Sequence, residues 1–173
     1  RFLRLINSWN LVEEPEQWLV YLLALLHRSG QETAVAICQR YHLSRRWIGK
    51  VKTGVAGWQE AVEVLRLGEK VRMSQLAEKV LPLPNEIYPV ILTQLNSRSI
   101  ARFRSLLNAL QYDRPCVNGN DIKSMGYKPG PYFASALEAL RRARLDGLVT
   151  NRQEELDFVR EYLAAHEGAI KSV

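Results

Sequence analysis

A corner rich in proline and glycine carries the residue types with the clearest chemistry. Residues 126–131 hold two prolines and two glycines between two expected helices. Asn118 can cap the first helix, and Gly126 can end it in the left-handed conformation. Gly130 and the proline after it suit the start of the next helix, which closes near Gly147. The free amides at that start carry partial positive charge and suit a phosphate group.

Basic residues surround this corner. Between residues 98 and 144 the chain has nine basic side chains against three acidic ones: Arg98, Arg102, Arg104, Arg114, Lys123, Lys128, Arg141, Arg142 and Arg144 against Asp113, Asp121 and Glu138. One interpretation is that prolines and glycines only set an interhelical angle, while the arginines only complement a helix dipole. The other is an RNA-binding surface. For it we select Lys123, Lys128, Gly130, Arg141 and Arg142.

A second basic stretch lies earlier in the chain. Residues 33–59 contain no acidic residue, and the segment YHLSRRWIGKVK interleaves aromatic and basic side chains. Such mixtures bind phosphates and stack on exposed bases. Arg45 and Arg46 directly follow Ser44, a good N-cap, where cations oppose the helix dipole. We predict that Arg45, Arg46 and Lys50 face RNA; the alternative is a solvated helix with a buried Trp47.

No catalytic constellation is evident in the sequence. The aspartates form no Asp-x-Asp pair of the kind that clamps two metal ions, and the three histidines lack ligand spacing. Neither a glycine-rich phosphate loop nor a Gly-x-Ser-x-Gly motif occurs. We therefore expect no catalysis, metal or cofactor in this chain alone. A self-contained enzyme of another type is the least favoured alternative.

Composition points to a globular protein with a polyanionic partner. The 173 residues are 47% hydrophobic and carry a net charge of +6, which attracts nucleic acid, although a solvated basic surface would look the same. Cys38 and Cys116 stand in unrelated contexts and suit free thiols in a reducing cytosol. The longest apolar run, Trp18 to Leu26, is too short to cross a bilayer. We expect a cytoplasmic protein with no membrane contact.

Hydrophobic periodicity predicts an all-α fold, an elongated array of short helices without a sheet. The expected helices cover residues 14–28, 31–41, 44–53, 58–67, a short segment capped by Ser74, a helix opened by Pro89, 97–112, 119–125, 131–146 and a final helix. We expect Gly54 and Gly57 to interrupt the region around residue 55, and Thr150 with Gln153 to form the last capping box. The weakest stretch, Leu67 to Pro84, suggests a boundary between regions 1–80 and 81–173.

The corner belongs to a longer motif. Its residues are Asn118, Gly119, Asp121, Ile122, Gly126, Pro129, Gly130, Pro131, Leu145, Asp146, Gly147 and Glu154 to Leu156. In this order and spacing, the segment 117–156 resembles the C-terminal part of bacterial tRNA nucleotidyltransferases of the CCA-adding or A-adding type, a family that includes bacterial poly(A) polymerases. Tyr132 departs from the family pattern, where a charged residue is common. The arginine-rich helix 131–146 is also more basic than in many members.

The resemblance implies a function in tRNA processing. The chain would be the helical body, truncated at its N-terminal end, and tail of such an enzyme. It would hold the tRNA elbow while a missing catalytic head, with its neck, adds nucleotides to the 3′ end. That head would use Mg²⁺ with ATP and, in some members, CTP. The partners implied are tRNA and the enzyme's own head and neck domains, with a homodimer left open. The alternative is a helical protein-interaction or oligomerisation module with incidental basic patches.

Overall fold

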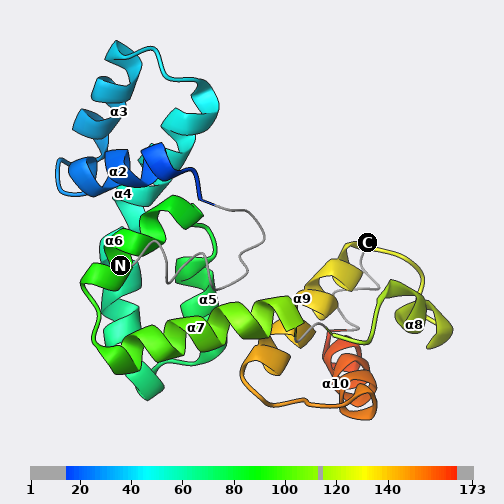
Figure 1. Cartoon of the computed structure of the whole chain (residues 1–173). Coiled ribbons are helices and arrows are strands. Elements are labelled where there is room, and N and C mark those ends of the chain that lie inside the picture. The colour runs from blue at the N-terminus through cyan, green and yellow to red at the C-terminus, as the bar shows by residue number, and fades with distance from the viewer. Residues whose placement is uncertain (1–14, 113–114, 167–173) are drawn as a thin grey trace. The chain divides into compact units, whose positions relative to one another are not determined.

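Every regular element in the described residues, 15–112 and 115–166, is a helix in the computed structural model. The predicted all-α class is therefore confirmed for this part of the chain. Two compact units are present, Arg1–Asn108 and Ala109–Val173 (Figure 1). The boundary suggested between Leu67 and Pro84 lies inside the first unit. The division into body, 1–80, and tail, 81–173, remains a prediction.

The long helix α4 organises the first unit. The elements are α2 (Gln17–Leu26), α3 (Gln31–Arg40), α4 (Arg45–Arg66), a 3-10 turn η1 (Gly68–Lys70), α5 (Met73–Val80), a second 3-10 turn η2 (Asn85–Ile87), α6 (Tyr88–Thr93) and α7 (Ser97–Tyr112), which crosses into the second unit. Helix α4 contacts α2, α3, α5 and α6. Its buried residues Val51, Val55, Trp58, Val62 and Leu65 recur at helical spacing and form the core-facing stripe.

Several polar groups in this core have hydrogen-bond partners. The Trp58 indole donates a hydrogen bond of 2.8 Å to the His27 carbonyl, and the Ser99 hydroxyl donates one of 3.0 Å to the Leu65 carbonyl. Tyr88 is buried against Phe103. Its burial, with a smaller contribution from the negative charge of Glu86, raises the pKa of Tyr88 to about 12. The phenol therefore stays neutral over the physiological range.

The two glycines that were expected to break α4 instead lie inside one continuous helix of 22 residues. They serve close packing. A Cβ on Gly54 would lie 3.2 Å from Leu23 Cδ2 and 3.3 Å from Pro84 Cγ, and one on Gly57 would lie 2.6 Å from Leu83 Cδ2. The prediction of an interruption was wrong because tertiary contacts offset the weak helix propensity of glycine.

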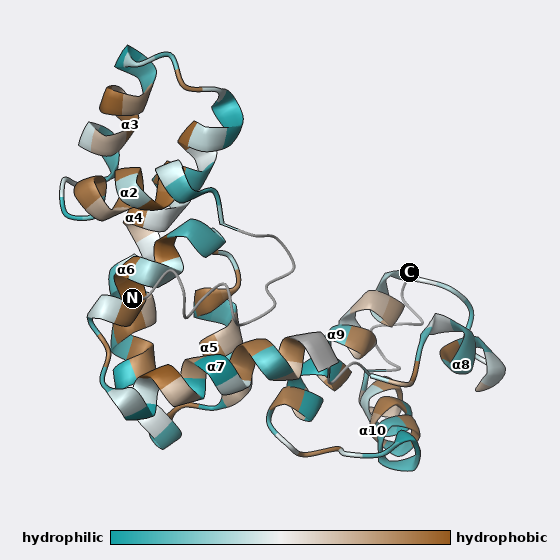
Figure 2. Ribbon diagram, in the orientation of Figure 1, coloured by the Kyte–Doolittle hydropathy of each residue, from teal (hydrophilic) through white to brown (hydrophobic). Residues whose placement is uncertain are grey.

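The second unit is a small helical cluster of α8 (Gly119–Ser124), α9 (Pro131–Leu145) and α10 (Arg152–Ala165). Its buried core is Val117, Ile122, Ala136, Leu140, Ala143, Val149, Val159 and Leu163. Phe133 and Leu137 pack against this core partly buried, and Leu140 is fully buried within it. Figure 2 shows hydrophobic and hydrophilic residues interleaved along α9 and α10, the pattern of amphipathic helices.

Two predicted helix starts were displaced. Helix α5 begins at Met73, and Ser74 is buried within its first turn; the Gln75 side chain accepts a hydrogen bond from the Arg72 amide instead. Helix α10 is capped by Asn151, whose side chain accepts a 3.0 Å hydrogen bond from the Glu154 amide. The capping chemistry is of the expected kind, but Asn competes with Thr at this position and is the stronger cap.

We predict opposite effects for two Gly→Ala substitutions within α4. At Gly49 a new Cβ meets nothing within 4 Å, so Gly49→Ala should raise the free energy of unfolding by about 1 kcal/mol through helix propensity. At Gly57 the new Cβ meets buried Leu83, and overpacking of about 1–3 kcal/mol should exceed that gain. Chemical denaturation of both variants tests this. An equal gain at the two positions would contradict close packing at Gly57.

Candidate nucleic-acid interface

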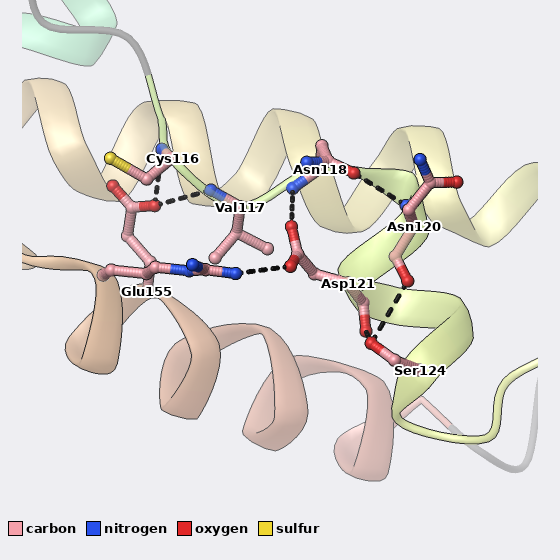
Figure 3. Close-up of polar contacts among 8 residues, drawn as sticks. Cys116, Val117, Asn118, Asn120, Asp121, Ser124 and Glu155 are labelled. Atoms are coloured by element: carbon pink, nitrogen blue, oxygen red, sulfur yellow. Dashed lines mark hydrogen bonds and ion pairs between the residues drawn. The ribbon is translucent and has the colours of Figure 1, made fainter.

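The turn into α8 is fixed by reciprocal hydrogen bonds. The Asn118 side chain accepts from the Asn120 amide at 2.8 Å, and the Asp121 carboxylate accepts from the Asn118 amide at 2.8 Å (Figure 3). This capping box satisfies amides that the helix leaves unpaired. Gly126 follows the helix with a φ of 94°. The predicted cap and positive-φ exit are both confirmed.

Asp121 also ties α8 to α10. Its second oxygen lies 2.8 Å from Arg152 Nη2, at the first position of α10. The hydrogen bond from Asn118, followed by the hydrogen bond and charge of Arg152, lowers the pKa of Asp121 below its ordinary value. The pKa of Glu154 is lowered too, first by the Thr150 amide. Both carboxylates therefore remain ionised at neutral pH and hold their turns closed.

A fully buried carboxylate joins three segments of this unit. Glu155 Oε2 accepts hydrogen bonds from the amides of Cys116 and Val117 at 2.8 and 2.9 Å. Its other oxygen pairs with Arg144 of α9. Figure 3 shows Glu155 reaching from α10 to the extended segment before α8. In the sequence, Glu155 stood out only as part of the motif segment Glu154 to Leu156, and that acidic position was the one signal for a structural role.

The start of α9 has the expected construction. Gly130 is the N-cap, Pro131 follows at the first helical position, and the backbone at Gly130 is extended. The Tyr132 ring lies over this glycine, so a Cβ there would come within 2.6 Å of Tyr132 Cε1. The Tyr132 hydroxyl also donates to the Lys128 carbonyl. A side chain at Gly130 would therefore displace the Tyr132 ring, independently of any RNA contact, which remains a prediction.

The cations selected in the second unit are exposed, but they differ in whether they pair with a carboxylate. Lys123, Lys128 and Arg141 are exposed. Arg142 is also exposed but lies 3.5 Å from Glu138, one turn earlier on α9, a pairing of little energetic weight at a surface. Arg144 is mostly buried against Glu155. Gly130 and Arg141 stand at opposite ends of α9, about 16 Å apart along its axis, so they suit an extended backbone rather than one phosphate.

The cations selected in the first unit also separate into two kinds. Arg45 and Arg46 are exposed, whereas Lys50 Nζ lies 2.6 Å from Glu86 Oε1, and the Glu86 side chain is 1% exposed. Lys50 thus compensates a buried charge, whose loss would destabilise the unit. Charge reversal at Lys50 would therefore affect stability as well as any RNA binding, and the RNA contact of Lys50 remains a prediction. Trp47 is half-buried, with the Arg46 guanidinium 5.0 Å from its ring centroid.

Comparison with known proteins identifies the relatives of this chain. It is 27% identical over 149 residues to the A-adding tRNA nucleotidyltransferase of Geobacter sulfurreducens, covering 83% of this chain and 17% of that protein. It is 26% identical over 166 residues to the CCA-adding enzyme of Bacillus mycoides, covering 90% and 38%. Its curated relatives are tRNA nucleotidyltransferases. No family model matches the sequence.

Solved structures of the same enzymes share the fold. A Thermotoga maritima CCA-adding enzyme complexed with tRNA matches with a TM-score of 0.70 and 23% identity, over 87% of this chain and 36% of that one. A CCA-adding enzyme in complex with ATP matches with a TM-score of 0.71 and 24% identity, over 96% and 39%. The chain thus corresponds to one part, well under half, of the tRNA nucleotidyltransferases it matches.

The described residues were also inspected for other kinds of site. In residues 15–112 and 115–166 no three or more His, Cys, Asp or Glu side chains gather as metal ligands would. None of the helices assigned there is both long and apolar enough to cross a membrane.

Removing the Glu155 carboxylate should loosen the second unit. Glu155→Ala leaves two backbone amides and Arg144 without their acceptor, so we expect a loss of about 3 kcal/mol. Hydrogen exchange at Cys116 and Val117 should accelerate strongly, measured by NMR. Glu161→Ala, an exposed position on the same helix, is the matched control and should change little. Unaltered exchange in Glu155→Ala would contradict the role given to this carboxylate.

The Asp121 hydrogen bond that caps α8 should persist on acidification until the pH falls below 3.8. Because the folded-state pKa of Asp121 is lowered from 3.8, its contribution to stability is present above that pH and is lost as the pH falls through the folded-state value. An NMR titration of the Asp121 carboxyl should therefore have a midpoint below 3.8. Arg152→Ala should move the midpoint upward only in part, since the Asn118 amide is the larger cause. A wild-type midpoint at or above 3.8 would refute the capping geometry in solution.

Proposed function

We propose that this chain is the tRNA-binding, non-catalytic body and tail part of a tRNA nucleotidyltransferase. In this role it holds the tRNA elbow, while a catalytic head joined to it by a neck domain extends the 3′ end with ATP, or with ATP and CTP, as substrate and Mg²⁺ as cofactor. The observation that carries the proposal is the exposure of four cations, Lys123, Lys128, Arg141 and Arg142. They lie on the same segment, 117–156, that bears the family motif.

Rigid presentation of these cations suits recognition of RNA shape. Phosphate contacts position a protein on RNA without reading its bases, and structured RNA is recognised largely through backbone geometry. Glu155 and Asp121 fasten α8, α9 and α10 to one another. The lysines of the α8–α9 corner and the arginines of α9 are therefore held at fixed separations, as a binding surface for an extended backbone requires.

An alternative is a protein-interaction or oligomerisation module. The observation that favours it is a set of exposed apolar side chains on α2, Trp18, Tyr21 and Leu25. An interface of that kind buries apolar area and depends weakly on salt, whereas neutralised RNA phosphates release counterions and make affinity fall steeply with salt. Salt dependence of binding therefore separates the two functions.

A titration of tRNA binding against salt concentration tests the proposal. Lys128→Glu and Arg141→Glu should each weaken binding and reduce the magnitude of the salt slope by about one, as for one lost phosphate contact. Lys70→Glu, at an exposed lysine of the other unit, is the matched control for net charge. Unchanged affinity and slope in both test variants would reject the tRNA surface. Nucleotide incorporation into tRNA by this chain alone, with ATP, CTP and Mg²⁺, would reject the non-catalytic assignment.

A further inference from the structure

Helix α2 has a second apolar face that the core does not use. Leu19, Leu23 and Leu26 point into the first unit and are buried. Trp18, Tyr21 and Leu25 share the other side of the helix, since they are three and four residues apart, and their side chains are 42%, 56% and 79% exposed. An apolar face of this size left in water is a mark of a binding surface.

This face forms one wall of a groove of about 350 Å³. Its other wall comes from α3 and the turn that follows, with Ile37, buried Cys38 and Tyr41. Tyr41 is 74% exposed and stands across the groove as a second aromatic rim. All the side chains that line the groove are uncharged and mostly aliphatic or aromatic. Such walls suit a flat, weakly polar group inserted between rings.

Cations adjoin this groove. The Trp18 ring contacts the Trp47 ring edge to face at 5.3 Å, and the Arg46 guanidinium lies 5.0 Å from the Trp47 centroid. On the other rim, exposed Arg40 directly precedes Tyr41 in the sequence. No acidic residue occurs from 33 to 59, so the charged side chains of α3 after Glu32 and of the first part of α4 are all basic. A ligand with apolar planar groups linked by anions matches both features.

We propose that the α2–α3 groove binds unpaired bases of single-stranded RNA, which stack on Tyr41, Tyr21 and Trp18 while Arg40 and Arg46 contact the adjoining phosphates. Stacking on aromatic rings accepts any base, because every base has a π-face. The groove offers few hydrogen-bonding groups, so binding is expected to be tolerant of sequence. This inference rests on the proposed RNA-binding function and assigns a distinct site to it, within the first unit.

Binding of fluorescently labelled short oligo(A) and oligo(U) to the whole 173-residue chain tests the groove. Tyr41→Ala should weaken both by about tenfold, as loss of one stacking ring does. Tyr41→Phe keeps the ring and should bind like the wild type. Leu67→Ala, another exposed apolar residue of the same unit (52% exposed), should have no effect. Trp18 emission should be quenched by the oligonucleotide, and circular dichroism checks that each variant is folded.

The outcomes separate this site from the proposed tRNA surface. If Lys128→Glu weakens tRNA binding while Tyr41→Ala leaves oligonucleotide binding unchanged, the groove assignment is overturned and the tRNA surface stands. The reverse result supports the groove and rejects the surface on α8 and α9. Failure of the chain to bind either oligonucleotide overturns the groove assignment. So does a Tyr41→Ala effect confined to self-association, measured by sedimentation, which would make the groove a protein interface.

Discussion

The buried carboxylate of Glu155 is the contact on which the second unit depends. An ionised group removed from water is tolerated only when hydrogen bonds and an opposite charge replace its hydration. Glu155 obtains both, from two backbone amides of the segment before α8 and from Arg144 of α9. The requirement is mutual, since the amide of buried Val117 would otherwise lack this acceptor. One side chain thus fixes where three segments meet, and with them the corner at residues 126–131.

The first unit uses the same principle with different elements. Glu86, in the turn before α6, is buried and receives the Lys50 ammonium from α4. Nearby, α4 approaches its neighbours closely because Gly54 and Gly57 have no side chains. Small residues and the ion pair between Lys50 and Glu86 Oε1 together set the packing of α4. Lys50 is paired with Glu86. Of the three cations selected on α4, Arg45 and Arg46 are therefore the exposed ones.

These constraints bear on function because they separate the basic residues that stabilise the fold from those that are exposed to solvent. In a chain of net charge +6, charge alone does not separate a binding surface from a solvated one. The cations held in place by buried acids, Lys50 and Arg144, stabilise the fold. The exposed cations Lys123 on α8, Lys128 in the turn before α9, and Arg45 and Arg46 on α4 are the ones proposed to meet a polyanion. In the proposed function, the structural cations position the elements that present the binding ones.

The sequence by itself determined the helical class, the caps at Asn118 and Gly130 and the positive-φ exit at Gly126, because these depend on residues close in the chain. It also carried the family resemblance, through the spacing of the motif in 117–156. Only the tertiary structure decided that Gly54 and Gly57 lie within one helix. It also decided that Glu155 is buried and joins three segments, and that Lys50 forms an ion pair with Glu86. It alone also brought Trp18 and Tyr41 to one groove. These arrangements depend largely on partners 23 to 39 positions away, and the energy of such long-range packing can override local preference.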